Sequence, residues 1–213
     1  MVVTKERLTI DSLKGKYGGP VFLLGSGPSL ASQVEYLPVL KDKHTFSCNR
    51  LQQWDQLRFS PTYHACNINT VRKGIEPDMP RFKRHKFIVG RERDFGYHDT
   101  SGWVEVTKSL AEPAGIDHIN PVATGASMSY IIAQIAVWLG HRKIYLLGCD
   151  TKEGPRVFES EPNTHLVSPN YKERWQELKK FFTANGITIR DCTPDGALND
   201  IVGYTPLAKV LNV

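Results

Sequence analysis

The chain has 213 residues, a hydrophobic content of 40% and a formal net charge of +5. This length and hydrophobic content suffice to bury a sizeable core, and they predict one domain over residues 1–213 that folds alone. No run approaches the roughly 18 apolar residues that cross a bilayer, and residues 1–19 hold no apolar signal core. We therefore expect a soluble, cytoplasmic protein.

The four cysteines are widely spaced and form no CxxC pair: Cys48, Cys66, Cys149 and Cys192. Zinc sites built on cysteine need such close pairs, and cytosolic thiols stay reduced. We expect four buried, reduced cysteines and no metal site.

Six Lys and Arg residues lie within RFKRHKFIVGRER, residues 81–93. Such a cluster could bind phosphate, nucleic acid or a membrane surface. However, the central KFIV predicts a strand, charged flanks protect the edges of sheets, and no aromatic-interleaved RNA motif accompanies the charge. We interpret the run as a solvated strand edge and expect no nucleic-acid partner.

The first unit is a buried strand, Val21–Leu24, followed by the turn Gly25-Ser26-Gly27-Pro28-Ser29. Glycines permit close approach to the backbone, and Pro28 suits the first turn of a helix. A strand, glycine turn and helix start can offer N–H groups to an anion. The GxGxxG fingerprint is incomplete because Leu30 fills its last position, so a well-packed corner without a ligand remains the alternative.

Three short strands follow, at residues 44–50, 61–70 and 86–92. Residues 94–121 then mix Gly, Pro, Asp and aromatic residues without a clear period, which predicts a loop-rich insertion or lid. Residues 151–170 are a second lid candidate.

Residues 124–150 combine a helix with helical spacing of apolar residues, a Gly140 stop and the strand KIYLLG. Thr124 and Ser127 at the helix start could favour a phosphate or simply cap the helix. An amphipathic helix over 170–185, a strand over 187–192, and a turn with one short helix complete the chain. The alternation of strands and helices predicts a Rossmann-like, mainly parallel sheet flanked by helices.

Ligands of open α/β sheets bind beyond the carboxyl ends of the strands, where this chain places several polar residues. Asn49 and Asn67 end two strands, and an amide can read ribose hydroxyls or a pyrimidine edge. A single asparagine there is more typical of an Asx turn. The expected nucleotide-binding residues are Gly25, Ser26, Gly27, Pro28, Ser29, Asn49, Asn67, Thr124, Ser127 and Asp150.

The segments GSGPSL, SCNR, ACN and SMSYIIAQIAVWLGHRKIYLLGCD resemble, in the same order, those of small bacterial CMP-sialic-acid-dependent sialyltransferases. They also resemble related hydroxymethylpterin-diphosphokinase-like proteins, which share the glycine turn and a late TPDGAL-like turn. The scattered blocks cover about two thirds of the chain. The resemblance implies a Rossmann-like domain with CMP near Ser26, Gly27, Asn49, Asn67 and Ser127.

The sequence also departs from the sialyltransferase pattern. The family has a tyrosine pair after the GxD strand that stabilises the leaving phosphate, whereas this chain has TKEGPR at 151–156. Lys152 or Arg156 could neutralise that charge instead. The family's general-base histidine falls near Pro169, and His165, four residues earlier, is either its replacement or a loop histidine without a role.

The leading hypothesis is a nucleotide-sugar-dependent glycosyltransferase that acts by direct displacement, with His165, Lys152 and Arg156 as catalytic candidates. No DxD motif is present, so no cofactor is required. One alternative is Mg²⁺-dependent pyrophosphoryl transfer using Asp150, Asp191 and Asp195. Another is a catalytically inactive nucleotide-binding module. The acceptor, a glycan or a small molecule, and a homo-oligomeric state stay open.

Overall fold

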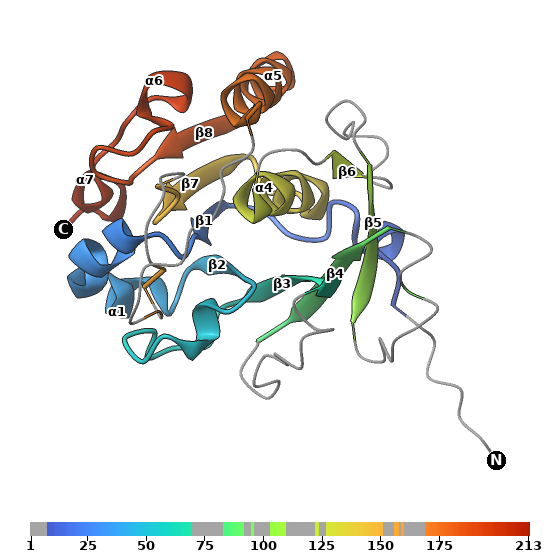
Figure 1. The fold of residues 1–213 in the computed structure, drawn as a ribbon, viewed down its shortest axis with the longest axis horizontal. Helices are drawn as coiled ribbons and strands as arrows, with labels where there is room; N and C mark the ends of the chain where they lie inside the picture. The colour runs from blue at the N-terminus through green and yellow to red at the C-terminus, as the bar shows by residue number, and fades with distance from the viewer. Residues whose placement is uncertain are drawn as a thin grey trace.

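The structure, a computed structural model, describes residues 8–69, 83–91, 95, 103–109, 122–123, 127–150, 156–157, 159 and 169–213. Within these residues, eight strands form one sheet in the order β6-β5-β4-β3-β2-β1-β7-β8, and every pairing is parallel (Figure 1). The strands are β1 Pro20–Leu24, β2 His44–Cys48, β3 Tyr63–Asn67, β4 His85–Gly90, β5 Val104–Ser109, β6 Val122–Ala123, β7 Lys143–Leu147 and β8 Thr188–Asp191. The predicted α/β class with a parallel sheet is confirmed.

The strand order reverses between β1 and β7. From β1 the chain builds β2 to β6 on one side, and then returns to place β7 and β8 on the other side of β1. Such a reversal opens a crevice beyond the carboxyl ends of the central strands, which is where open α/β sheets bind ligands.

Helices cover both faces of the sheet. The helices of the described residues are η1 Asp11–Leu13, η2 Pro28–Tyr36, α1 Leu37–Leu40, η3 Leu51–Gln53, α4 Met128–Leu139, α5 Tyr171–Ala184, α6 Asn199–Val202 and α7 Leu207–Leu211. Val21 and Leu23 of β1 face the core beneath α4 and α5, whereas Phe22 and Leu24 face η2, α1 and α7. Figure 1 shows α4 lying across the first of these faces.

Helix α4 is buried along almost its whole length. Ser127 caps its start by accepting a hydrogen bond from the Tyr130 N–H, and Gly140 ends it with a left-handed φ of 113°. Only Met128 among its residues is not buried, so the helix reads as a continuous apolar run rather than an amphipathic one. Helix α5 is amphipathic, with Trp175, Leu178 and Phe182 buried.

Three features differ from the sequence expectations. Strand β5 falls within residues 94–121, for which no strand was predicted; most of both lid segments lies outside the described residues. The closing segment forms two short helices, α6 and α7, instead of one. Strand β4 pairs with both β3 and β5, so the interpretation of the basic run as a strand edge was wrong.

Within the part of the chain that the structure describes, no helix is long and apolar enough to cross a membrane.

Candidate functional site

The glycine turn after β1 packs tightly against the chain after β7. The Gly25 N–H donates to the Leu147 carbonyl at 2.7 Å, and the Gly27 N–H donates to the Gly148 carbonyl at 2.9 Å. A Cβ on Gly27 would lie 1.9 Å from Asp150 Oδ2, and one on Gly25 would lie 2.3 Å from the Gly148 oxygen. These glycines therefore allow residues 148–150 of the same chain to approach the turn closely.

Asp150 occupies the helix start that the sequence analysis assigned to a phosphate. Its side chain is buried, and Oδ2 accepts a hydrogen bond from the Ser29 N–H at 3.1 Å. Anions favour such helix starts, and here the protein supplies its own carboxylate. The N–H groups of Gly25, Gly27 and Ser29 all donate within the chain, so the turn does not offer these three to a ligand.

The structure brings Asn49 and Asn67 together. Asn49 has a φ of 49°, a left-handed conformation that asparagine tolerates, and its Oδ1 accepts from the Asn67 N–H at 3.1 Å. Asn67 Oδ1 accepts from the Asn69 N–H at 3.0 Å, which is the Asx turn that the sequence analysis gave as the alternative. The Nδ2 amide is the part of Asn49 that remains to donate to a ligand.

Ser127 acts as a helix cap. Its Oγ accepts from the Tyr130 N–H at 3.3 Å and lies 2.7 Å from the Ser129 hydroxyl. Burial raises the pKa of the nearby Cys149 thiol well above its usual value, and Asp191 adds to this; a hydrogen bond with Ser129 acts in the opposite direction. The start of α4 therefore lies against the strand end that carries Asp150. Thr124 falls outside the described residues.

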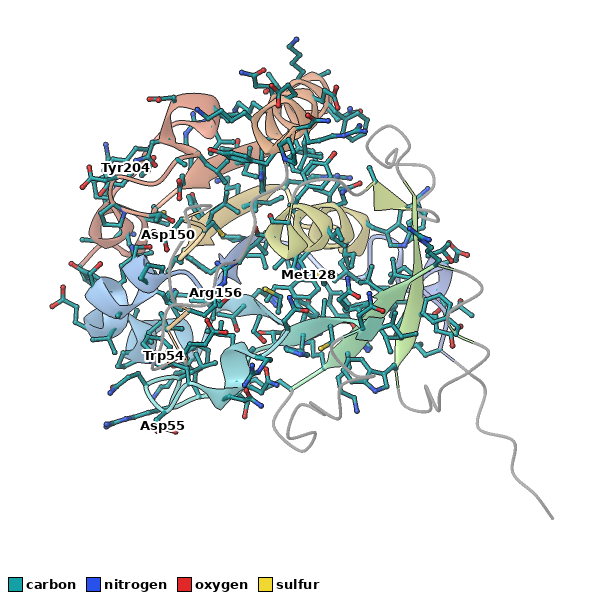
Figure 2. The ribbon with its side chains drawn as sticks, in the orientation of Figure 1. Trp54, Asp55, Met128, Asp150, Arg156 and Tyr204 are labelled. Carbon is teal, nitrogen blue, oxygen red and sulfur yellow. The ribbon has the colours of Figure 1, made fainter. Side chains whose placement is uncertain are left out.

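Arg156 lies on a segment that docks onto the glycine turn. The Val157 N–H donates to the Ser26 carbonyl at 3.0 Å, and Glu159 accepts from the Arg156 N–H at 3.0 Å. Burial raises the pKa of the Cys48 thiol to about 12, while the Arg156 charge opposes that rise, which places Arg156 near the end of β2. Figure 2 shows Asp150 at the arrowhead end of β7 and labels Arg156 in the same part of the molecule. Lys152 and His165 fall outside the described residues.

On this side of the sheet, the described residues offer no hydrogen-bond partner to four buried side-chain atoms. They are Ser29 Oγ, Gln33 Oε1 and both amide atoms of Gln52. Ser29 and Gln33 belong to η2, which follows β1, and Gln52 belongs to η3, which follows β2. Leaving such an atom buried without a hydrogen bond costs about 1–3 kcal/mol, so the fold carries this cost at η2 and η3.

Sequence reasoning did not identify Gln33 or Gln52. Gln33 Nε2 donates to the Cys192 carbonyl at 2.6 Å, which ties η2 to the segment after β8. Gln52 is only 9% exposed, although its neighbour Gln53 is exposed. The one sequence signal was a pair of glutamines a few residues after the end of β2, and it does not show which of the two is buried.

The third group of polar residues follows β8. Burial and Asp150 raise the pKa of Asp191, which stands at about 6 although the Thr193 hydrogen bonds lower it. Asp191 Oδ1 accepts from the Thr193 N–H at 2.9 Å, and Asp195 adopts a φ of 51° in the turn that follows. Among the described residues, no three His, Cys, Asp or Glu side chains are grouped so as to hold a metal ion. Asp191 thus organises the turn over 193–199.

Comparisons with known proteins gave a structural likeness without a sequence match. No protein-family model matches the chain, and no curated protein matches it. The sialyltransferase CstII from Campylobacter jejuni in complex with CMP superposes with a TM-score of 0.54 at 16% identity, over 88% of this chain and 85% of that one.

Two further solved structures are similar to a comparable extent. An α-2,3-sialyltransferase from Campylobacter jejuni in apo form has a TM-score of 0.55 at 16% identity, over 87% of this chain and 79% of that one. CstII in complex with CMP-3FNeuAc has a TM-score of 0.55 at 14% identity, over 89% and 86%. The chain therefore has the fold of these sialyltransferases.

Proposed function

We propose that the protein is a nucleotide-sugar-dependent glycosyltransferase that binds a CMP-type donor beyond the carboxyl ends of β1, β2 and β3. The observation that carries this proposal is that Ser29, Gln33 and Gln52, on the helices that follow β1 and β2, hold buried polar atoms for which the described residues offer no hydrogen-bond partner. It occurs in a chain with the fold of a sialyltransferase whose solved structure contains CMP. Each buried polar atom without a partner in a native fold calls for a specific explanation, and a bound ligand is one.

The proposed roles follow from the chemistry of each side chain. The Gln52 amide both donates and accepts, as the edge of a cytosine requires, and the Asn49 Nδ2 group can donate to a ribose hydroxyl. Arg156 lies on the segment that docks onto the glycine turn, so in this proposal it binds the phosphate that the turn's own N–H groups do not hold.

Transfer in this proposal is a direct displacement of CMP by an acceptor hydroxyl. The leaving phosphate gains negative charge as its bond to the sugar breaks, and a positioned guanidinium stabilises that charge. His165, as the base that takes the acceptor's proton, and Lys152, as a second cation, complete the proposed catalytic group. A neutral imidazole is required for the first role.

The test is calorimetric titration of the protein with CMP, UMP, GMP and AMP, each with and without Mg²⁺. We expect CMP to bind best and without a Mg²⁺ requirement. A strict Mg²⁺ requirement would instead favour pyrophosphoryl transfer, and tight CMP binding without turnover of any CMP-linked sugar would favour a binding module. No binding of any nucleotide would contradict the proposal.

Asn49 offers a matched pair of variants. Asn49→Asp keeps the oxygen that accepts from the Asn67 N–H and a residue that tolerates left-handed backbone, but it removes the Nδ2 donor. Asn49→Gly keeps the backbone conformation alone. Both should lower the affinity for CMP, whereas only Asn49→Gly should also disturb the Asn67 turn. CMP affinity equal to that of the wild type in both would remove Asn49 from the site.

A further inference from the structure

The opposite, amino-terminal edge of the sheet carries a concentration of positive charge. The segments that lead into β1, β2, β4 and β7 cover residues 11–19, 41–43, 83–84 and 141–143. They contain eight exposed basic residues, which we call the basic row: Lys14, Lys16, Lys41, Lys43, Lys83, Arg84, Arg142 and Lys143. The only acidic residues in these segments are Asp11 and Asp42. The excess of six positive charges exceeds the formal charge of +5 for the whole chain.

The sheet aligns these residues. The strands lie in the order β4-β3-β2-β1-β7, so their starts follow one another across four inter-strand spacings. At about 4.8 Å per spacing, the basic row spans about 19 Å. Lys83 Nζ donates to the Lys41 carbonyl, which joins the segments before β4 and β2. The Gly15 and Tyr17 N–H groups donate to the Trp138 and Leu139 carbonyls, which holds the segment before β1 against the end of α4.

Two histidines beside the row respond to its positive charge. Burial lowers the pKa of His44 and of His85 at the starts of β2 and β4, and the charged neighbours that lower them further are Arg84 and Lys16. Among the described residues, the charged groups that shift the pKa of these two histidines are all cations. Arg84 also stacks over the Tyr17 ring at 4.7 Å, an arrangement that fixes the position of its charge.

The shape of the row favours a linear polyanion over a membrane. A row follows a polymer backbone, whereas a membrane presents a plane of charge. Leu8, Val34, Val39, Tyr204 and Val213 are the exposed large hydrophobic residues of the described chain, and none lies in the four segments. Exposed apolar anchors of that kind are what interfacial membrane binding uses. The tyrosines here, Tyr17 and Tyr63, pack against histidines instead of standing free to stack on bases.

We propose that the basic row binds the phosphodiester backbone of a nucleic acid, without sequence preference. The site lies at the edge of the sheet opposite the proposed donor site, and it does not depend on any transferase activity. The interaction would be electrostatic, because phosphates contacted by Lys and Arg release their counterions.

The experiment measures fluorescence anisotropy of a labelled 20-base-pair DNA duplex of mixed sequence between 50 and 300 mM salt. The test variant is Lys41→Glu/Lys43→Glu/Lys143→Glu, which changes exposed residues only. The matched control is Lys172→Glu/Lys180→Glu/Lys209→Glu, which makes the same charge change at exposed residues of α5 and α7. At 150 mM salt the Debye length is about 8 Å, so distant charges are screened.

We expect the wild type to bind the duplex with an affinity that falls steeply with salt. The test variant should bind about 10- to 100-fold more weakly and lose about three units from the slope of log K against log salt, since each phosphate contact contributes about 0.9. The affinity of the control variant for the duplex should fall by less than about threefold at 150 mM salt. Circular dichroism and thermal unfolding of each variant verify that it remains folded.

Three results would overturn the proposal. Equal loss in the test and control variants would mean that net charge alone is responsible. No binding by the wild type at 50 mM salt would remove the site. If the wild type sedimented with phosphatidylserine vesicles but did not bind the duplex, and the test variant did not sediment with them, the row would be assigned to a membrane surface instead.

Discussion

The two edges of the sheet differ in where they place their polar groups. At the carboxyl edge, polar atoms are buried, and Asp150 and Asp191 accept backbone N–H groups of the turns that follow the strands. At the amino edge, exposed Lys and Arg residues surround a packed layer of histidines and tyrosines. The difference follows from a parallel arrangement, because helices begin near the carboxyl edge and end near the amino edge, so their dipoles favour carboxylates at one and cations at the other.

The histidine and tyrosine layer supports the amino edge. His141 Nδ1 lies 3.1 Å from the Gly19 carbonyl, and Nε2 lies 3.3 Å from the Tyr63 hydroxyl. The His44 ring lies 4.9 Å from that of His141. Burial is the main cause of the lowered pKa of His141, about 4, so this layer is packed with neutral imidazoles. Stability at this edge should therefore depend on pH.

The largest effect is expected from Gly27→Ala at the carboxyl edge. The added Cβ would lie 1.9 Å from Asp150 Oδ2 and 2.8 Å from the Gly148 oxygen, and backbone there cannot move freely. We expect a loss of about 3–5 kcal/mol in the free energy of unfolding, measured by urea denaturation. Gly18→Ala is the control, because nothing lies within 4 Å of its Cβ and its φ is not left-handed. Equal stabilities of the two variants would mean that the glycine turn is not tightly packed.

The second-largest effect is expected from acid, which should lower the stability of the amino edge. The pKa of His141 is about 4 in the fold against about 6.5 in the unfolded chain, so the unfolded state takes up the proton first. The contribution of neutral His141 to the free energy of unfolding is therefore complete above pH 6.5. About 2–3 kcal/mol of it is lost as the pH falls towards 4. Buried His64, whose pKa is about 3, acts in the same direction.

Asp191 opposes this trend between about pH 4 and 6. Its raised pKa, about 6, means that the fold prefers its protonated form, so its contribution is present at low pH and is lost as the pH rises. The measurement is urea denaturation at pH 7 and pH 4.5 of the wild type and of His141→Asn. The variant should lose less stability on acidification, and equal losses would show that His141 does not titrate as described.

Arg156→Gln should weaken phosphate binding at the carboxyl edge. A hydrogen bond to a charged group contributes about 1.5–3 kcal/mol, so we expect CMP affinity to fall about 10- to 100-fold by calorimetry. Cytidine, which has no phosphate, should bind the wild type and the variant equally. Arg174→Gln is the control on α5, where Arg174 contacts Glu177 at 3.2 Å. Equal losses for CMP and cytidine would show that Arg156 does not act on the phosphate.

Gln52→Met should have the smallest effect, and it should act in opposite directions on stability and binding. Replacing a buried amide that lacks partners by an apolar side chain of similar shape should raise the free energy of unfolding by about 1 kcal/mol. Removing the amide should also lower CMP affinity by several-fold. The exposed neighbour gives the control Gln53→Met, for which neither change is expected. A destabilised Gln52→Met would mean that the amide has partners within the fold.

The sequence by itself determined the parallel α/β fold, because buried strands, glycine turns and helical spacing are local patterns that can be recognised one after another along the chain. It also determined the end of α4 at Gly140, while it left both Thr124 and Ser127 open as the cap. It did not determine β5, because VEVTKS alternates too weakly to be distinguished from a loop until β4 lies beside it.

Only the tertiary structure decided which polar groups are available to a ligand. The residues of the glycine turn were correctly placed at a strand end, but their N–H groups are used by Leu147, Gly148 and Asp150, more than a hundred residues further along the chain. The burial of Gln52 and the alignment of the basic row likewise depend on strand order. Parallel pairing joins residues that are distant in sequence, and no local pattern records which donor meets which acceptor.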